Sequence, residues 1–118
     1  MHSLAAAAQA DVPEARVVKA LNNHAMEVFH AEPEALRAAA VQSFLAGDDA
    51  KRVVGGLLRD LGLTPVDFGD LANAWLLEVQ ADLLRTYLFA VGNPLFSPAL
   101  IEVPKAEPRF GGRRPGTY

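Results

Sequence analysis

The segment from Thr64 to Gly92 constrains the fold of this chain more than any other. It opens with Thr64-Pro65-Val66-Asp67, the order of a helix N-cap, a proline at the first helical position and an acid three residues after the cap. It closes with Gly92-Asn93-Pro94, a C-cap glycine followed by a helix breaker. The apolar residues between these ends are Phe68, Leu71, Trp75, Leu76, Leu77, Val79, Leu83, Leu84, Tyr87, Leu88, Phe89 and Val91. The pattern predicts one long central helix, with Leu83 and Leu84 in the core.

Three shorter helices are expected before it. The first follows Asp11-Val12-Pro13-Glu14 and runs to about His30, because apolar residues recur there at intervals of three and four. The second follows Glu32-Pro33-Glu34 and runs to about Ala46. The third is capped by Asp48 or Asp49 and closed by Gly62. Within the third, Gly55 and Gly56 each cost roughly 1 kcal/mol relative to alanine, which indicates a close helix crossing or a bend.

These elements predict an all-α fold, a compact bundle of about four helices around the long apolar helix. A chain of 118 residues is about one domain. We divide it into a flexible N-terminal segment (1–11), a helical bundle domain (12–92) and an extended, proline-rich C-terminal arm (93–118). Residues 95–103 are too apolar for a free tail, so the arm is expected to dock through its side chains, on its own bundle or on a neighbour's.

Composition excludes several classes of function. The net charge of -3 gives no overall footprint for nucleic acid or anionic lipid. The absence of cysteine rules out disulfides and thiolate metal sites. No uninterrupted run of about 20 apolar residues is present for a membrane span. The N-terminus lacks the basic region of a signal peptide, so we expect a cytoplasmic protein, with a periplasmic or secreted location left open.

Few residues suggest chemistry. His24, Glu27 and His30 recur every three residues of the first expected helix and are weak candidates for metal ligands, but no second cluster of ligands accompanies them. Glu78, Asp82 and Arg85 share a helix face, where an acid–base pair is possible and a solvated ion pair is commoner. No catalytic triad, phosphate loop or dinucleotide glycine signature occurs. We therefore predict no catalytic residues, no metal and no cofactor.

Two alternatives to a binding role remain open. One is a small enzyme or ligand-binding helical bundle. The other is a DNA-binding regulator, because Leu61 to Ala72 has the residue pattern of the first part of a helix-turn-helix domain. The acidic surroundings argue against DNA, since a DNA reader needs lysine and arginine there, and nucleic acid is not expected as a partner.

The favoured hypothesis is a protein-interaction or assembly module, as an accessory subunit, an adaptor or a homo-oligomer. Apolar residues surround the long helix on a helical wheel, so either the other helices and the arm cover it completely or Trp75 and its neighbours are left for a partner, because exposed apolar patches usually mark interaction sites. The expected partner is therefore another protein or a second copy of the chain. The residues predicted to bind it are Leu71, Trp75, Phe89, Leu95, Phe96, Leu100 and Ile101.

Overall fold

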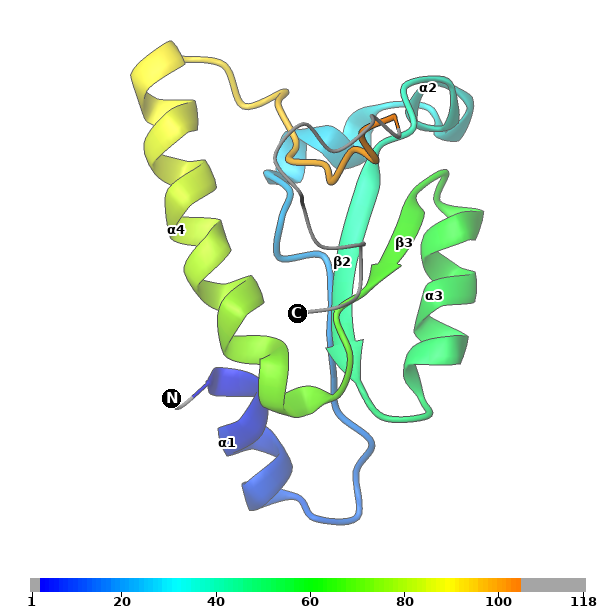
Figure 1. The fold of residues 1–118 in the computed structure, drawn as a ribbon, viewed down its shortest axis with the longest axis vertical. Coiled ribbons are helices and arrows are strands. Elements are labelled where there is room, and N and C mark those ends of the chain that lie inside the picture. The colour runs from blue at the N-terminus through cyan, green and yellow to red at the C-terminus, as the bar shows by residue number, and fades with distance from the viewer. Residues whose placement is uncertain (1–2, 105–118) are drawn as a thin grey trace, which may run out of the picture.

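The computed structural model describes residues 3–104, which form helices on both sides of a small mixed sheet (Figure 1). The α-helices are α1 (Leu4–Asp11), α2 (Pro33–Ala38), α3 (Lys51–Asp60) and α4 (Ala74–Val91), and two short 3-10 helices are η1 (Met26–His30) and η2 (Leu71–Asn73). The strands are β1 (Val18–Lys19), β2 (Gln42–Gly47) and β3 (Thr64–Asp67). The prediction of an all-α bundle is therefore wrong.

Strand β2 is the centre of the sheet, whose order is β1-β2-β3. Strands β2 and β3 are parallel, with Gln42 opposite Thr64, and α3 connects them as a β-α-β unit. Strand β1 runs antiparallel to β2, with Val18 opposite Gly47. Both residues of β1 therefore pair with the carboxyl end of β2, with Lys19 opposite Ala46, and the chain leaves β1 in the direction of the amino end of β2.

The two faces of β2 bury different clusters. Phe44 and Ala46 pack with Ala5, Ala74 and Leu77 on the side of α1 and α4. On the other face, Leu45 packs in a second cluster whose other buried members are Val28, Leu36, Leu58 and Leu63. Figure 1 shows α3 and α4 on opposite sides of the sheet, consistent with this division.

Three of the four expected helices had the wrong extent or the wrong conformation. The second ends at Ala38, and β2 follows where helix was expected up to Ala46. The first is replaced by β1 and η1. The long helix begins at Ala74, because Thr64–Asp67 is strand β3, and this also overturns the helix-turn-helix interpretation. Pro65 fits β3 because proline is tolerated on an edge strand, where its missing N–H breaks no ladder.

The glycine ends of two expected helices were confirmed, whereas the expected flexible N-terminal segment was not. Helix α3 ends before Gly62, which has a φ of 90°, and α4 ends at Gly92, which has a φ of 67°. Helix α3 continues through Gly55 and Gly56, and the neighbour of Gly55 is Pro65 of β3, not a crossing helix. Residues 4–11, expected to be flexible, form α1, whose first turn is capped by Ser3. The division of the chain into three segments, at residues 11 and 92, remains a prediction.

Helix α4 leaves most of its apolar surface uncovered within the described chain. Only Ala74 and Leu77 are buried, whereas Leu83 and Phe89 are 73% and 80% exposed. The expectation that Leu83 belongs to the core is wrong, and Leu84 is half-buried. Among residues 3–104, no helix has the combination of length and apolar composition needed to cross a bilayer.

Candidate functional site

The loop that follows β1 is held in a strained conformation. Leu21 has a φ of 62°, a left-handed value that costs a residue with a side chain about 1–3 kcal/mol. Such strain persists only where neighbouring contacts fix the backbone, and it is common at functional sites. In this loop the next three residues, Asn22, Asn23 and His24, each form a side-chain hydrogen bond to a different part of the chain.

Asn23 fixes the loop to the sheet. Its side chain is 1% exposed, its Oδ1 accepts the Phe44 N–H at 3.0 Å, and its Nδ2 donates to the Gln42 carbonyl at 2.9 Å. One amide side chain thus pairs with the backbone of β2 as a further strand would. Asn22 Nδ2 donates to the Leu77 carbonyl at 2.7 Å and joins the same loop to α4.

His24 joins the loop to the segment after α4. Its Nδ1 lies 2.6 Å from Ser97 Oγ, and its ring meets the Phe29 ring edge-on with centroids 5.7 Å apart. Burial lowers the pKa of His24 from 6.5 to about 4, so the imidazole is neutral at pH 7. We assign the ring proton to Nδ1, because this leaves the Ser97 hydroxyl free to donate its single proton to the Asn23 carbonyl at 3.3 Å; Nε2 is then an acceptor.

Two buried acceptors in this region have no hydrogen-bond partner among the described residues. They are Nε2 of His24 and Oε1 of Gln80, on α4. Buried polar atoms are nearly always paired, and an unpaired one carries a desolvation cost of about 1–3 kcal/mol. A ligand that donates hydrogen bonds would remove that cost.

Two cavities lie beside these acceptors. One, of about 300 Å³, is lined by Gln80, Leu83, Leu84, Tyr87, Ser97 and Pro98. The other, of about 260 Å³, is lined by Leu21, Asn22, His24, Ala25, Ala81, Leu84, Arg85 and Leu88. Because Leu84 lines both, we treat them together as the His24 pocket. Its walls are mostly apolar with a few polar groups, the usual character of a small-molecule site.

The segment after α4 closes one side of this region through polar contacts. Gln42 Nε2 donates to the Leu100 carbonyl and Gln42 Oε1 accepts the Leu100 N–H, both at 2.8 Å. The Tyr87 and Phe96 rings meet edge-on at 5.5 Å. The described part of the arm therefore lies on its own chain, although Leu95, Leu100 and Ile101 stay 58–83% exposed. Polar and aromatic contacts, more than burial of apolar side chains, hold it.

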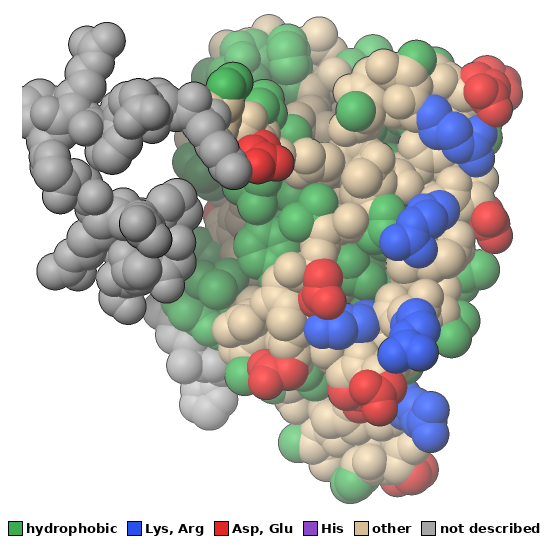
Figure 2. Space-filling model, turned by 45° about the vertical axis from the view of Figure 1, so that its right-hand side comes forward, with side chains coloured by type: hydrophobic (Ala, Val, Ile, Leu, Met, Phe, Trp, Pro, Cys, Tyr) green, Lys and Arg blue, Asp and Glu red, His purple; other side chains and the backbone are tan. Residues whose placement is uncertain are grey.

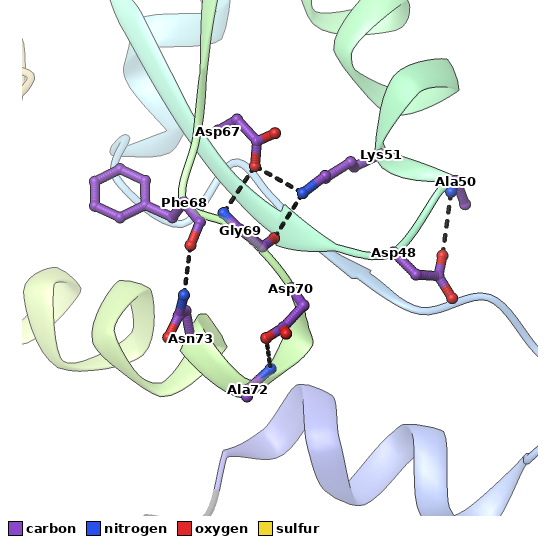
Figure 3. A network of polar contacts seen from close by, with 9 residues as sticks. All are labelled: Asp48, Ala50, Lys51, Asp67, Phe68, Gly69, Asp70, Ala72 and Asn73. Carbon is purple, nitrogen blue, oxygen red and sulfur yellow. Dashed lines mark hydrogen bonds and ion pairs between the residues drawn. The ribbon is translucent and has the colours of Figure 1, made fainter.

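A different polar network lies at the carboxyl ends of β2 and β3 (Figure 3). Lys51 Nζ donates to Asp67 Oδ1 and to the Gly69 carbonyl, each at 2.9 Å, and the Gly69 N–H donates to Asp67 Oδ1 at 2.7 Å. The Lys51 hydrogen bond, followed by that of Gly69, lowers the pKa of Asp67. Figure 3 shows these groups pointing toward one another, so the network is satisfied internally and joins α3 to β3.

The residues predicted from sequence are distributed as follows. Leu71 packs against the α4-side cluster and Trp75 is half-buried, whereas Phe89 and Ile101 are at least 80% exposed. Phe96 contacts Tyr87, and partner binding by this set remains a prediction.

The candidate metal ligands do not come together. The His24 ring contacts the Ser97 hydroxyl, and His30 is exposed. Within residues 3–104 no three potential metal ligands gather, so His24, Glu27 and His30 do not form the suggested cluster. Asp82 and Arg85 form an exposed ion pair at 2.8 Å, while Glu78 accepts the Leu4 N–H.

The sequence did not single out Asn22, Asn23, Gln80 or Ser97. The available signal was the triplet Asn22-Asn23-His24, which begins four residues after the apolar, β-branched pair Val17-Val18. Asparagine favours turns over helix interiors, so this triplet argued for the end of an element.

Comparison with known proteins gives a similar solved structure. No protein-family model matches the sequence, and no curated protein matches it. The fold is similar to a solved structure from Arthrobacter sp. FB24, provisionally described as an F420-dependent NADP-reductase, with a TM-score of 0.76 and 28% sequence identity. The similarity covers 86% of this chain and 47% of that one, so this chain spans about half the length of that protein. This finding contradicts the all-α interaction module and supports an oxidoreductase-like α/β fold.

Proposed function

We propose that this chain is part of an NADP(H)-dependent oxidoreductase, in which the His24 pocket binds the nicotinamide end of the cofactor. Two observations support the proposal. The fold is similar to that of a protein described as an NADP-reductase. His24 lines one of the two cavities and Gln80 lines the other, and each side chain has a buried polar atom, His24 Nε2 and Gln80 Oε1, without a partner among the described residues; this is the observation that carries the assignment to this site.

The residues of the pocket suit a nicotinamide ring. Its carboxamide offers two N–H donors, and the chain offers two buried acceptors. Leu84 and Tyr87 supply apolar and aromatic surface for the flat ring. A neutral His24 is required in this role, because an imidazolium would have a donor, and not an acceptor, at Nε2.

The size of the pocket limits the proposal to one end of the cofactor. The two cavities measure about 260 Å³ and 300 Å³, the low end of the range for ligand pockets. The sequence also has no glycine-rich phosphate loop, so the pyrophosphate of a dinucleotide has no loop of that kind to bind here.

The chain's contribution to the chemistry is to position the ring and exclude water. The nicotinamide, when bound, supplies or accepts the hydride. Asn22 and Asn23 hold the loop, and Ser97 holds the His24 imidazole at Nδ1 so that Nε2 keeps one orientation. Desolvation by Leu84 and its apolar neighbours strengthens each hydrogen bond to the ring.

Calorimetric titrations with reduced nicotinamide mononucleotide, NADPH and 2′-phospho-ADP-ribose test the assignment. We expect the first two ligands to bind the His24 pocket, with an affinity that depends on His24, and the third not to bind this pocket, because only the first two contain nicotinamide. His24→Phe keeps an aromatic ring beside Phe29 and removes the acceptor, so it should weaken binding by about fivefold or more.

His30→Gln is the matched control, because His30 is exposed and does not line the His24 pocket. It should bind as the wild type does, and thermal melts of all variants would establish that they are folded. Absence of nicotinamide binding, or equal binding by wild type and His24→Phe, would overturn the proposal. Saturable binding of F420 in place of nicotinamide would assign the pocket to the other cofactor of the similar reductase.

A further inference from the structure

A second cavity lies on the opposite side of the sheet, along α3. Its volume is about 300 Å³. The lining residues come from β2, α3, β3 and the turn before α3, and they are Leu45, Asp49, Lys51, Arg52, Gly55, Arg59, Pro65 and Asp67. Figure 2, turned so that the α3 side comes forward, shows a column of lysine and arginine side chains among acidic ones on this face. We call this cavity the α3 groove.

The sequence of α3 shapes the groove. Arg52, Gly55 and Arg59 are spaced by three and four residues, so they share one helix face. The two arginines are separated by about 10 Å along the axis, at about 1.5 Å per residue. Gly55, between them, has no side chain, and a Cβ there would be 3.9 Å from Pro65. The groove therefore has a floor of glycine backbone and proline, and Arg59 Nη1 is also 3.9 Å from the position of that Cβ, so the Arg59 guanidinium lies beside the glycine.

The two arginines are the groove's unneutralised cations. Within residues 3–104, Lys19, Arg37, Lys51 and Arg85 each form an ion pair with a carboxylate, whereas Arg52 and Arg59 form none. Lys51 and Asp67 neutralise each other at 2.9 Å. Asp49 is the remaining carboxylate of the lining, so two guanidinium groups face one acid.

We propose that the α3 groove binds a phosphate group, that of a phosphate monoester or a diphosphate, between Arg52 and Arg59. Guanidinium is planar, always charged and matched in geometry to two phosphate oxygens, and two such groups can hold a phosphate from both ends. The glycine floor lets the anion approach the helix backbone closely. This site is independent of the His24 pocket, because β2 separates α3 from α4.

Calorimetric titration of the full chain with inorganic pyrophosphate tests the proposal, with inorganic phosphate and AMP as separate arms. We expect saturable binding of pyrophosphate that weakens as sodium chloride is raised. Arg52→Gln and Arg59→Gln should each weaken it about tenfold or more, since each removes charge-assisted hydrogen bonds. Arg16→Gln, at an exposed arginine outside the groove that also forms no ion pair within residues 3–104, should bind as the wild type does.

A pair of glycine variants tests the position of the anion. Gly55→Leu places a side chain in the groove and should abolish binding, whereas Gly56→Leu points into open space and should not change it. Circular dichroism would establish whether both variants are folded. If Gly55→Leu is unfolded, the arginine variants alone test the proposed phosphate site. No saturable binding of any of the three anions, or equal weakening by Arg16→Gln, would overturn the proposal. Stronger binding of AMP than of pyrophosphate would assign the groove to a nucleotide phosphate, and the reverse to a free diphosphate.

Discussion

Gly62 illustrates how a single residue determines the path of the chain. It ends α3 with a φ of 90°, and a Cβ at this position would collide with the Pro33 backbone. Gly62→Ala should therefore lower the free energy of unfolding by about 2 kcal/mol or more, from backbone strain and the collision together.

The matched control is Gly56→Ala, in the interior of α3, where no atom lies within 4 Å of the new Cβ. It should raise the free energy of unfolding by about 0.5–1 kcal/mol, because alanine is the better helix former. Urea denaturation of both variants measures the two changes, and a stable Gly62→Ala protein would show that the α3–α2 contact is absent.

His24 makes stability depend on pH in a defined window. Its pKa is 6.5 in the unfolded chain and about 4 in the folded one, so the unfolded chain binds more protons between these values. The contribution of His24 to the free energy of unfolding should be constant above pH 6.5 and should fall as the pH falls toward 4. Urea denaturation across this range checks the slope.

Variants isolate this contribution from the carboxylates that titrate in the same range. His24→Phe should flatten the slope, and His30→Gln, at an exposed position, should retain it. Parallel profiles for wild type and His24→Phe would mean that His24 is protonated in the folded protein, against its burial.

Helix α4 differs from its sequence-based description in which residues it buries. Leu77 is 2% exposed and packs with Phe44, whereas Leu83, one and a half turns later, is 73% exposed. Leu77→Ala should cost about 2–5 kcal/mol, and Leu83→Ala about 0.5 kcal/mol or less. Thermal or urea denaturation of the two variants compares them directly. Equal losses would contradict the orientation of α4, and a loss in Leu83→Ala that depends on protein concentration would place this face in an interface.

Helix ends that depend on a single local residue could be predicted from the sequence. Gly62 and Gly92 end α3 and α4 because they adopt positive φ angles, and this depends on the glycine alone. Strand β2 could not be predicted in this way. It is buried on both faces, so its apolar run has no alternation, and Phe44 and Leu45 also fit the helical spacing from Leu36.

The candidate site was predictable only in part, for a related reason. His24 attracted attention as a residue type, but its partner, Ser97, is 73 residues away along the chain. Asn23 acts through the backbone of β2, so its role depends on a strand that the sequence pattern did not reveal. Contacts of this kind arise from tertiary packing and leave no local signature.

At the scale of the whole molecule, β2 separates two surfaces of different chemistry. The α4 side has the mostly apolar His24 pocket, and the α3 side has the groove lined by Arg52 and Arg59. The structural similarity to the protein described as an NADP-reductase covers 86% of this chain. On the α4 side, we propose that the His24 pocket binds nicotinamide.

Nitrogen-15 NMR of the imidazoles during titration with reduced nicotinamide mononucleotide tests this claim most directly. In the free protein at pH 7, His24 should show a protonated Nδ1 and an unprotonated Nε2. On titration, the Nε2 resonance of His24 should move upfield and saturate as it accepts a hydrogen bond, while the exposed His30 stays unchanged. An unchanged Nε2 resonance at saturating ligand, or an imidazolium at His24 in the free protein, would contradict the account.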